Sequence, residues 1–273
     1  MGSGPVHAIG GRAFVKAKLR RRKFGSLVPG TRHTALPTVA WRNIGAMKWH
    51  REHLPDPLPA EPLELAARWL AEATAGQVQP NPNAMVLATV DAAGQPSARV
   101  VLCKQLEPVP GSLTFYTNYE SRKGRELQQQ PRAAIVMHWD SLHRQVRVEG
   151  RITRVSAAES DSYFATRNWQ SRLGAWASQQ SQPIASRAEL LRKVATTALR
   201  LALPVPADEQ HPDPGLRITR PPHWGGFRLW AEAVELWVEG SARIHDRARW
   251  QRTLTAQGEG FAGGPWSVTR LQP

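Results

Sequence analysis

The residues best suited to chemistry in this sequence are cations at strand ends and turns. Arg99 and Lys104 bracket an apolar run, and Arg122 and Lys123 stand where a helix is expected to begin. Folded proteins seldom place charge in such positions without a partner. Several Arg, Lys and hydroxyl donors can hold a phosphate through charge-assisted hydrogen bonds, and the first N–H groups of a helix add to them. The pattern indicates phosphate binding, although each cation alone is typical of a solvated surface.

A glycine motif near the end of the chain is not a nucleotide site. Residues 258–263 match G-x-G-x-x-G, the dinucleotide fingerprint. That fingerprint works only between a strand and a helix, and Pro265 and the nearby chain end leave no room for the helix or the next strand. The motif therefore predicts a glycine-rich turn. The sequence also contains no P-loop and no G-x-S-x-G nucleophile motif.

Neither the histidines nor the single cysteine predicts a metal site or a nucleophile. The pairs His50/His53 and His138/His143 lack the third ligand and the carboxylate that a catalytic zinc site needs. Cys103 lies within an apolar run, where a free cysteine usually behaves as a small core residue. We therefore expect no metal.

Short strands separated by turns dominate the chain. Residues 61–70 carry apolar side chains at helical spacing and predict a first helix. Residues 84–90 and 98–104 flank the turn Asp91–Gly94 and predict a β-hairpin. Further predicted strands cover residues 113–117, 133–139, 144–155, 226–230, 234–238, 242–247 and 266–271, and further predicted helices cover residues 121–130, 157–165 and 186–203. The helices are too few for repeated βαβ units, so we predict one α+β domain, mainly β, built around an antiparallel barrel.

Composition excludes several classes of protein. The apolar runs fall far short of the ~20 residues of a membrane-spanning helix. One cysteine cannot form an internal disulfide, and it suits a reducing compartment. We expect a soluble cytoplasmic protein with no membrane partner.

The net charge of +14 is concentrated in the N-terminal segment. Residues 1–51 hold 11 of the 36 Lys and Arg and no Asp or Glu, so the remaining chain has 25 basic and 22 acidic residues, a net of +3. We treat residues 1–46 as a basic, disordered extension outside the 47–273 domain. A start at Met47, an organelle-targeting segment and an arm for an anionic partner are open alternatives, and contact with nucleic acid is expected only through this segment.

Residues 47–273 contain a series of distinctive blocks in a fixed order. The blocks are Arg99-Val-Val-Leu-Cys-Lys104, Phe115-Tyr-Thr-Asn118, Ser121-Arg-Lys123, Arg144-Gln-Val146, Tyr163-Phe-x-x-Arg167, Gly174-Ala-Trp-Ala-Ser178, Gln180-Ser181, Trp224-Gly-Gly-Phe-Arg228, Glu235-Leu-Trp237, Arg243-Ile-His-Asp-Arg247 and Arg270-Leu-Gln-Pro273. With these blocks, the chain resembles the pyridoxine/pyridoxamine 5'-phosphate oxidases. The resemblance implies an FMN-binding split β-barrel, an antiparallel Greek-key barrel with peripheral helices. It also implies a homodimer with FMN at the interface.

By this resemblance, two sets of residues form the site. The FMN set is Arg99, Val100, Val101, Leu102, Cys103, Lys104, Tyr116, Thr117, Arg122, Lys123, Gln145, Gln180, Ser181, Trp237 and Arg247. The substrate set is Lys104, Tyr163, Arg167 and Ser171 around the phosphate, with Arg243 and His245 as catalytic residues around the pyridine ring. Gln145 and Arg247 are candidates to stabilise charge near flavin N1. Core packing is an alternative role for Trp237.

The implied reaction is oxidation of pyridoxamine or pyridoxine 5'-phosphate to pyridoxal 5'-phosphate. A hydride leaves the C4' carbon for flavin N5, dioxygen is reduced to hydrogen peroxide, and the amine route also releases ammonia. Two departures from the family pattern bear on this implication. Residues 168–172 read Asn-Trp-Gln-Ser-Arg where the family has Pro-Arg and then Ser-Gln, and Arg51-Glu-His53 lacks the tyrosine of the family's lid element.

Two other functions compete with this interpretation. One is a related split-barrel oxidase that acts on a bulkier substrate such as a phenazine precursor. The other is a catalytically impaired protein that binds FMN or pyridoxal phosphate. Lys104, Tyr163, Arg167, Arg243 and His245 together favour the vitamin B6 phosphates.

Overall fold

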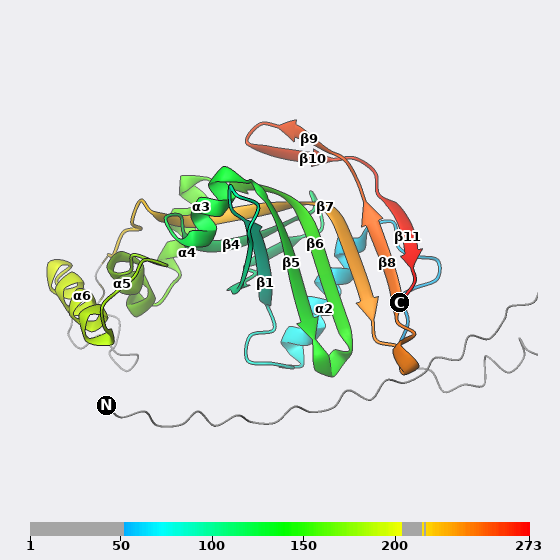
Figure 1. The fold of residues 1–273 in the computed structure, drawn as a ribbon, viewed down its shortest axis with the longest axis horizontal. Coiled ribbons are helices and arrows are strands. Elements are labelled where there is room, and N and C mark those ends of the chain that lie inside the picture. Colours follow the sequence, from blue (N-terminus) through cyan, green and yellow to red (C-terminus); the bar gives the residue numbers. More distant parts are fainter. Residues whose placement is uncertain (1–51, 204–214, 216) are drawn as a thin grey trace, which may run out of the picture. The chain divides into compact units, whose positions relative to one another are not determined.

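The computed structural model describes residues 52–203, 215 and 217–273 of the chain. The strands are β1 (Ala84–Val90), β2 (Pro96–Leu102), β3 (Gln105–Glu107), β4 (Ser112–Asn118), β5 (Arg132–Trp139), β6 (Arg144–Arg154), β7 (Trp224–Val238), β8 (Asp246–Gln251), β9 (Leu254–Gln257), β10 (Gly260–Gly263) and β11 (Ser267–Leu271). Nine of these strands form one antiparallel sheet in the order β11-β8-β7-β6-β5-β1-β2, with β4 on β7 and β3 on β4. The sheet curls without closing, as Figure 1 shows. The mainly β, antiparallel prediction is confirmed.

Strand β7 connects the other parts of this sheet, because β4, β6 and β8 all pair with it. It pairs with β6 along almost its whole length, while its other edge pairs first with β4 and then with β8. A register shift interrupts the β6 pairing at Glu149/Gly150. A Cβ atom on Gly150 would lie 1.8 Å from the carbonyl oxygen of Trp230, so only glycine allows the two strands to approach so closely there. The two ends of β7 therefore serve different parts of the fold.

Helices cover the sheet and extend one end of it. They are α2 (Pro62–Ala75), α3 (Arg122–Gln129), α4 (Ala157–Ala165), α5 (Trp169–Ala177) and α6 (Arg187–Arg200), with 3-10 turns η2 (Asp140–Leu142) and η3 (Ser241–Arg243). Helices α5 and α6 lie near the beginning of β7, and β8 lies near its end (Figure 1). No helix among the described residues is long and apolar enough to cross a membrane.

Two apolar clusters hold these elements together. The larger cluster joins the sheet to α2 through side chains such as Leu63, Trp69 and Trp250. The smaller cluster joins α4, α5 and α6 around Trp169 and Trp224. The beginning of β7 thus belongs to the helical cluster, and the rest of β7 to the main core.

The predicted helices and most predicted strands are found, with some differences at particular elements. The segments predicted as strands 226–230 and 234–238 form the single strand β7, because Ala231 and Ala233 between them pair with Gly150 and Glu149 of β6, and Glu232 lies at the register shift. The strand predicted to begin at Ala242 begins at Asp246, after the 3-10 turn η3, because Ala242 and Arg243 adopt positive φ values of 55° and 66°. Helix α5 and strands β3, β9 and β10 were not predicted.

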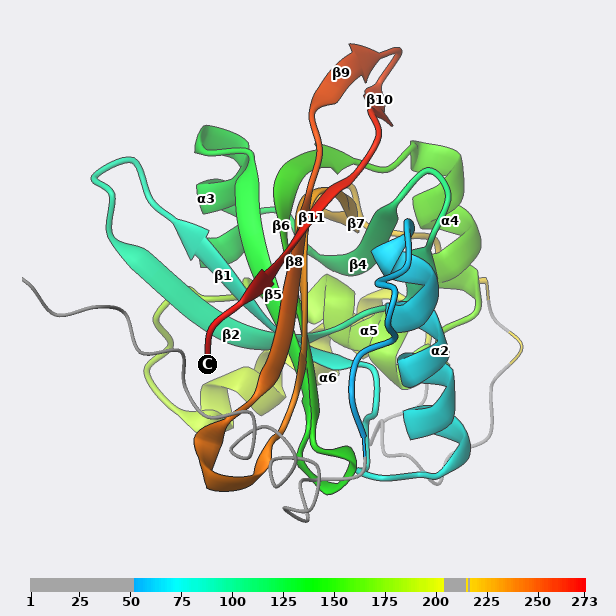
Figure 2. The same cartoon turned by 90° about the vertical axis from the view of Figure 1, so that its right-hand side faces the viewer.

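The glycine motif forms a turn, as predicted. Gly258 has a φ of +56° and lies between β9 and β10, which pair as a hairpin. Figure 2 shows this hairpin extending beyond β8 and β11. The predictions for residues 1–46 lie outside the described residues.

Candidate functional site

A cavity of about 1000 Å³ brings together most of the predicted site residues. The predicted residues that line it are Arg99, Val100, Val101, Leu102, Lys104, Tyr116, Thr117, Arg122, Lys123, Tyr163, Arg167, Ser171, Gln180 and Ser181. They come from β2, the link between β2 and β3, β4, α3, α4, α5 and the segments that follow α4 and α5. The cavity is large enough for a ligand of cofactor size.

Lys123 is the most buried cation of this cavity. Its side chain is 8% exposed, and its Nζ donates to Gln180 Oε1 at 3.0 Å and to Thr117 Oγ1 at 3.2 Å. The hydroxyl of Ser121, which accepts from Gly124 N and caps α3, lies 3.4 Å from the same Nζ. Burial, reinforced by the charge of Arg99, lowers the pKa of Lys123 to about 8. A buried ammonium whose bonds go to neutral oxygens is suited to an anionic ligand.

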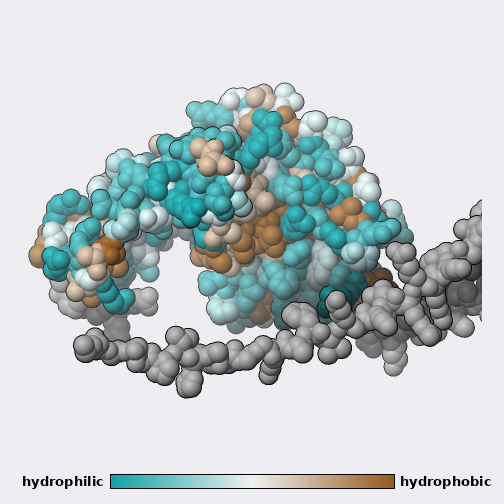
Figure 3. Space-filling view, in the orientation of Figure 1, coloured by the Kyte–Doolittle hydropathy of each residue, from teal (hydrophilic) through white to brown (hydrophobic). Residues whose placement is uncertain are grey.

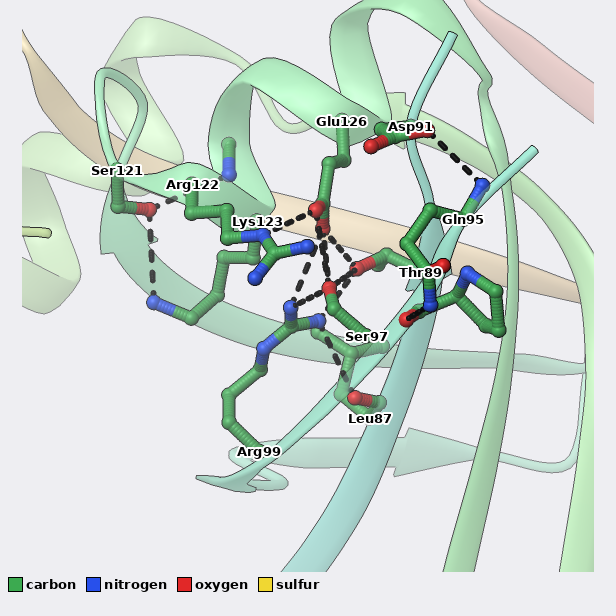
Figure 4. Close-up of polar contacts among 12 residues, drawn as sticks. Leu87, Thr89, Asp91, Gln95, Ser97, Arg99, Ser121, Arg122, Lys123 and Glu126 are labelled. Carbon is green, nitrogen blue, oxygen red and sulfur yellow. Dashed lines mark hydrogen bonds and ion pairs between the residues drawn. The ribbon is translucent and has the colours of Figure 1, made fainter. Parts of the chain in front are cut away.

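Beside Lys123, a buried carboxylate joins two more cations. Glu126 is 3% exposed, and it accepts hydrogen bonds from Thr89 Oγ1 at 2.5 Å and from Ser97 Oγ at 2.7 Å. It also forms ion pairs with Arg122 Nε at 2.8 Å and with Arg99 Nη2 at 3.1 Å (Figure 4). Burial alone would raise the pKa of Glu126, but these hydrogen bonds and the charge of Arg99 outweigh it and lower the pKa to about 2.

Aromatic rings form another wall of the cavity. The rings of Tyr116 and Tyr163 stack with centroids 3.9 Å apart, and Trp224 stacks 5.6 Å from Tyr116. Lys104 Nζ lies 5.8 Å from the centroid of Tyr163, and the Arg167 guanidinium lies 4.6 Å from that of Trp224. Arg167 Nη1 is buried and has no hydrogen-bond partner among the described residues, and burial lowers the pKa of Arg167. A buried guanidinium nitrogen without a partner is costly, so this wall suits an anionic group.

The atypical segment 168–172 starts helix α5. Asn168 Oδ1 accepts from the backbone N–H of Ser171 at 2.9 Å and so caps the helix. Trp169 is 2% exposed in the smaller apolar cluster. The departure from the family pattern therefore supplies a helix cap and a core anchor, and it leaves Ser171 on the cavity wall.

Apart from Cys103, the remaining predicted residues form a separate group, which we call the distal group: Gln145, Trp237, Arg243, His245 and Arg247. Gln145 and Arg247 pair with Trp237 from opposite sides across the sheet, and the ring of His245 lies 4.6 Å from that of Trp237. None of the group lines the cavity. Gly226, which pairs with the cavity residue Tyr116, precedes Trp237 by eleven residues on β7. At a rise of ~3.3 Å per residue, this is roughly 36 Å along the strand.

A second buried glutamate holds Arg247 of the distal group. Glu235 is 3% exposed and accepts from Arg247 Nη2 at 2.8 Å and from Arg147 Nη1 at 3.1 Å. Each end of the predicted site therefore contains an arginine that is fixed by a buried carboxylate.

Cys103 belongs to the core, as its place in an apolar run predicted. Its side chain is 3% exposed, its Sγ lies 3.2 Å from the carbonyl oxygen of Gln105, and burial raises the pKa of the thiol to about 12. Only its neighbours line the cavity. No group of three or more His, Cys, Asp or Glu in the described residues could hold a metal ion. Arg51 and His50 lie outside the described residues.

The roles of Glu126 and Glu235 were not predicted from the sequence, and neither was the position of Trp224 on the cavity wall. Glu126 follows Arg122 by four residues on a predicted helix, a spacing that signals an ion pair. No comparable signal marks Glu235, because its partner Arg147 lies on another strand.

Comparisons with known proteins identify relatives over most of the chain. The family model "Pyridoxamine 5'-phosphate oxidase" matches residues 71–200, and the model "Pyridoxine 5'-phosphate oxidase C-terminal dimerisation region" matches residues 224–273. A pyridoxine/pyridoxamine 5'-phosphate oxidase of Paracoccus denitrificans is 46% identical over 78% of this chain and 95% of its own length. One from Bordetella petrii is 46% identical over 81% of this chain and 93% of its own length.

Solved structures share the fold. The crystal structure of PhzG from Burkholderia lata, in complex with tetrahydrophenazine-1-carboxylic acid, has a TM-score of 0.67 and 29% identity, and it covers 80% of this chain and 95% of that chain. An FMN-binding, pyridoxamine 5'-phosphate oxidase-related protein of Nostoc punctiforme has a TM-score of 0.52 and 19% identity, and the match covers 74% of this chain and 96% of that chain. The curled sheet is therefore a split barrel of the expected kind.

Proposed function

Because this chain belongs to the pyridoxamine 5'-phosphate oxidase family, we propose that it is an FMN-dependent oxidase of pyridoxamine and pyridoxine 5'-phosphate. The products are pyridoxal 5'-phosphate and hydrogen peroxide, with dioxygen as the electron acceptor. The observation that carries this proposal is a cavity lined by two groups of cations with different neighbours: Lys123 bonds to Gln180, and Arg167 lies over the ring of Trp224. We call these the Lys123 end and the Arg167 end of the cavity. FMN and the substrate each bring one phosphate, so two groups of cations match two ligands.

The residues present fit FMN at the Lys123 end. Arg99, Arg122 and Lys123 supply positive charge, and Thr117 with Ser121 supplies hydroxyl groups beside them. This donor set matches a phosphate monoester, which charge-assisted hydrogen bonds hold most strongly. When bound, FMN supplies an acceptor for two electrons, which no protein side chain here provides.

The residues at the other end of the cavity would bind the substrate phosphate. Lys104, Arg167 and Ser171 line this end, and the partnerless Nη1 of Arg167 would gain an anionic partner. Tyr163 adds a ring and a hydroxyl group to the same wall. Their task is to hold the substrate in a fixed orientation, which is the main contribution that a protein makes to cofactor chemistry.

One neighbouring hydroxyl group stays protonated throughout the neutral range. Burial raises the pKa of Tyr116 to about 12, with a further contribution from the carboxylate of Glu159. Tyr116 Oη lies 3.5 Å from Glu159, which also accepts two bonds from Arg228 at 2.9 and 3.0 Å. Tyr116 therefore acts as a neutral donor and ring wall rather than as a base.

We propose further that two copies complete each site. The distal group is roughly 36 Å along β7 from the cavity, so one chain does not bring them together. In a symmetric dimer, the partner subunit's Gln145, Trp237 and Arg247 would reach the flavin ring, and the partner subunit's Arg243 and His245 would reach the substrate ring. The match of residues 224–273 to a dimerisation region supports this arrangement.

Exposed apolar side chains on the hairpin β1–β2 also support a dimer. Val86, Val90 and Val100 are 42%, 37% and 65% exposed. Figure 3 shows apolar residues gathered over β1, between the part with α5 and α6 and the body of the sheet. An exposed apolar patch of this kind is typical of an interaction surface.

The first experiment tests the function itself. The purified full-length chain should be yellow, contain one FMN per subunit, and release hydrogen peroxide with pyridoxamine 5'-phosphate or pyridoxine 5'-phosphate. A colourless protein that FMN does not stabilise against heat would refute the proposal.

The second experiment tests whether each site uses two subunits. Lys123→Ala removes a cavity residue, and Arg247→Ala removes a distal residue. If each site uses both subunits, a heterodimer of the two variants has one site with both changes and one site with none. Random co-assembly should then restore about a quarter of the wild-type activity. If the site lies within one chain, every site carries a change, and no activity should return.

The solved PhzG structure keeps a second candidate open, a split-barrel oxidase for a phenazine precursor. The cationic wall of Lys104 and Arg167 favours a phosphorylated substrate over an unphosphorylated tricycle. A protein that binds FMN or pyridoxal phosphate without turnover is the third candidate. Peroxide release with each substrate class, measured on the same preparation, separates the three.

A further inference from the structure

A buried carboxylate beside the cavity, in contact with its lining residues Arg99 and Arg122, needs an explanation. A carboxylate repels a phosphate, and burying one is costly unless it is paired and hydrogen-bonded. Glu126 is nevertheless 3% exposed at this position. Its partners come from three elements: Thr89 on β1, Ser97 and Arg99 on β2, and Arg122 on α3 itself. So complete a set of partners indicates that the negative charge has a role at the site.

The contacts of Glu126 decide how the two arginines are held. Arg122 has a side chain that is 53% exposed, so without an anchor it could adopt many rotamers. Its bond to Glu126 uses Nε and leaves its two Nη nitrogens for a ligand. Arg99 donates from both Nη nitrogens, to Glu126 at 3.1 Å and to the carbonyl oxygen of Leu87 at 3.3 Å, with further bonds to Thr89 and Ser97. Figure 4 shows the two guanidinium groups converging on this one carboxylate.

The charges at this end of the cavity match a phosphate monoester. Arg99, Arg122 and Lys123 contribute three positive charges and Glu126 one negative charge, which gives 3 − 1 = +2. A phosphate monoester carries about −1.5 to −2 near pH 7. Without the carboxylate, three cations would face one another across a partly buried site, and Lys123 would lose the one charge that raises its pKa.

We propose that Glu126 is the positioning residue of the flavin-phosphate site. It fixes Arg99 and Arg122 in place before the ligand arrives, and it sets the charge of the site to that of a phosphate monoester. The inference rests on the proposed function, because the phosphate in question is that of FMN.

The test compares FMN with riboflavin, which has the same ring and no phosphate. Full-length protein is stripped of flavin and titrated with each compound while flavin fluorescence is recorded. Glu126→Gln should weaken FMN binding by about tenfold or more, the scale of a lost bond to a charged group, and should leave riboflavin affinity unchanged. Glu120→Gln is the matched control, because Glu120 is exposed and uses its backbone N–H and carbonyl groups in its hydrogen bonds with Asn118 and Arg125.

Three results would overturn the inference. Unchanged or tighter FMN binding by Glu126→Gln would show that the carboxylate does not organise the site. An equal loss of FMN and riboflavin affinity would show a purely structural role. If the wild-type chain bound no flavin, the proposed function would fail as well, whereas the first two results leave that function intact.

A second variant keeps the test decisive if Glu126→Gln does not fold. Thr89 does not line the cavity, and Thr89→Val conserves the shape while removing the 2.5 Å bond to Glu126. It should weaken FMN binding several-fold and leave riboflavin binding unchanged. Equal affinities of Thr89→Val and wild type for FMN would contradict the proposed role of Glu126.

Discussion

Replacing Lys123 by methionine should stabilise the flavin-free protein and weaken FMN binding at the same time. Burial is the main cause that lowers the pKa of Lys123 from 10.5 to about 8. One pKa unit corresponds to about 1.4 kcal/mol, so a charged Lys123 destabilises the folded, flavin-free state by about 3 kcal/mol near pH 7. Methionine has a similar length and no charge. Lys123→Met also loses the bonds to Gln180 and Thr117. We therefore expect the free energy of unfolding of the flavin-free protein to rise by about 1–2 kcal/mol.

The pH dependence gives the sign of this effect. Because the pKa is lower in the folded state, the unfolded chain binds more protons between pH 8 and 10.5. The stability of the wild-type, flavin-free protein should therefore rise through this range as Lys123 loses its proton. The advantage of Lys123→Met should be largest below pH 8 and should disappear near pH 10.5.

Two measurements on the same samples test this prediction. Thermal unfolding of the flavin-free protein should give a higher Tm for Lys123→Met by roughly 2–8 °C at pH 7. Titration with FMN should show that the binding free energy of FMN is weaker in Lys123→Met by about 1.5–3 kcal/mol, the scale of a hydrogen bond to a charged group. Lys193→Met on α6 is the control, since Lys193 bonds to Gln179 at 3.2 Å on an exposed surface. A Lys123→Met protein that is less stable than wild type at pH 7, or that binds FMN equally well, would refute the reasoning.

Three further predictions concern the substrate, the helix cap and the N-terminal segment. Arg243→Ala should lower kcat with pyridoxamine 5'-phosphate far more than it alters FMN affinity. Lys104→Ala and Arg167→Ala should mainly raise KM. Normal turnover by Arg243→Ala would contradict the roles that the family resemblance implies for these residues. Asn168→Ala should lower the free energy of unfolding by about 1 kcal/mol, because α5 loses its cap. It should also raise KM, because Ser171 on the cavity wall is held less firmly. An unchanged denaturation midpoint would argue against the cap. A chain that begins at Met47 should keep FMN and activity, while any binding to nucleic acid should be lost with residues 1–46 and weaken with salt in the full chain; loss of flavin on this deletion would show that the segment supports the domain.

Local patterns were sufficient to predict much of the fold. The hairpin 84–104 was predicted from two apolar runs around the turn Asp91–Gly94, and it is found as β1 and β2 in register. A helix was predicted over residues 121–130, and it is found as α3, which the hydroxyl group of Ser121 caps. Such features depend on neighbours a few residues away, so the sequence displays them directly.

The long strand β7 shows where local patterns fail. Residues 224–238 contain charged side chains in a run that otherwise looks like two strands. Strands β4, β6 and β8 pair with this run, and its two glutamates form ion pairs with arginines of β5 and β6, namely Arg132 and Arg151 with Glu232, and Arg147 with Glu235. Those partners lie about 80 to 100 residues away along the chain, so no short window of sequence contains them.

The sequence by itself determined which residue types could bind phosphate and which blocks carry the family resemblance. Only the tertiary structure decided that these residues separate into a cavity group and a distal group at opposite ends of β7. It also decided that Glu126 is buried between Arg99 and Arg122. The sequence alone is equally compatible with a Glu126 side chain that is exposed to solvent. The physical reason is that burial and charge pairing depend on which distant segments meet. Packing of α3 against the β1–β2 hairpin brings the three elements together at Glu126, and the length of β7 keeps its two ends apart.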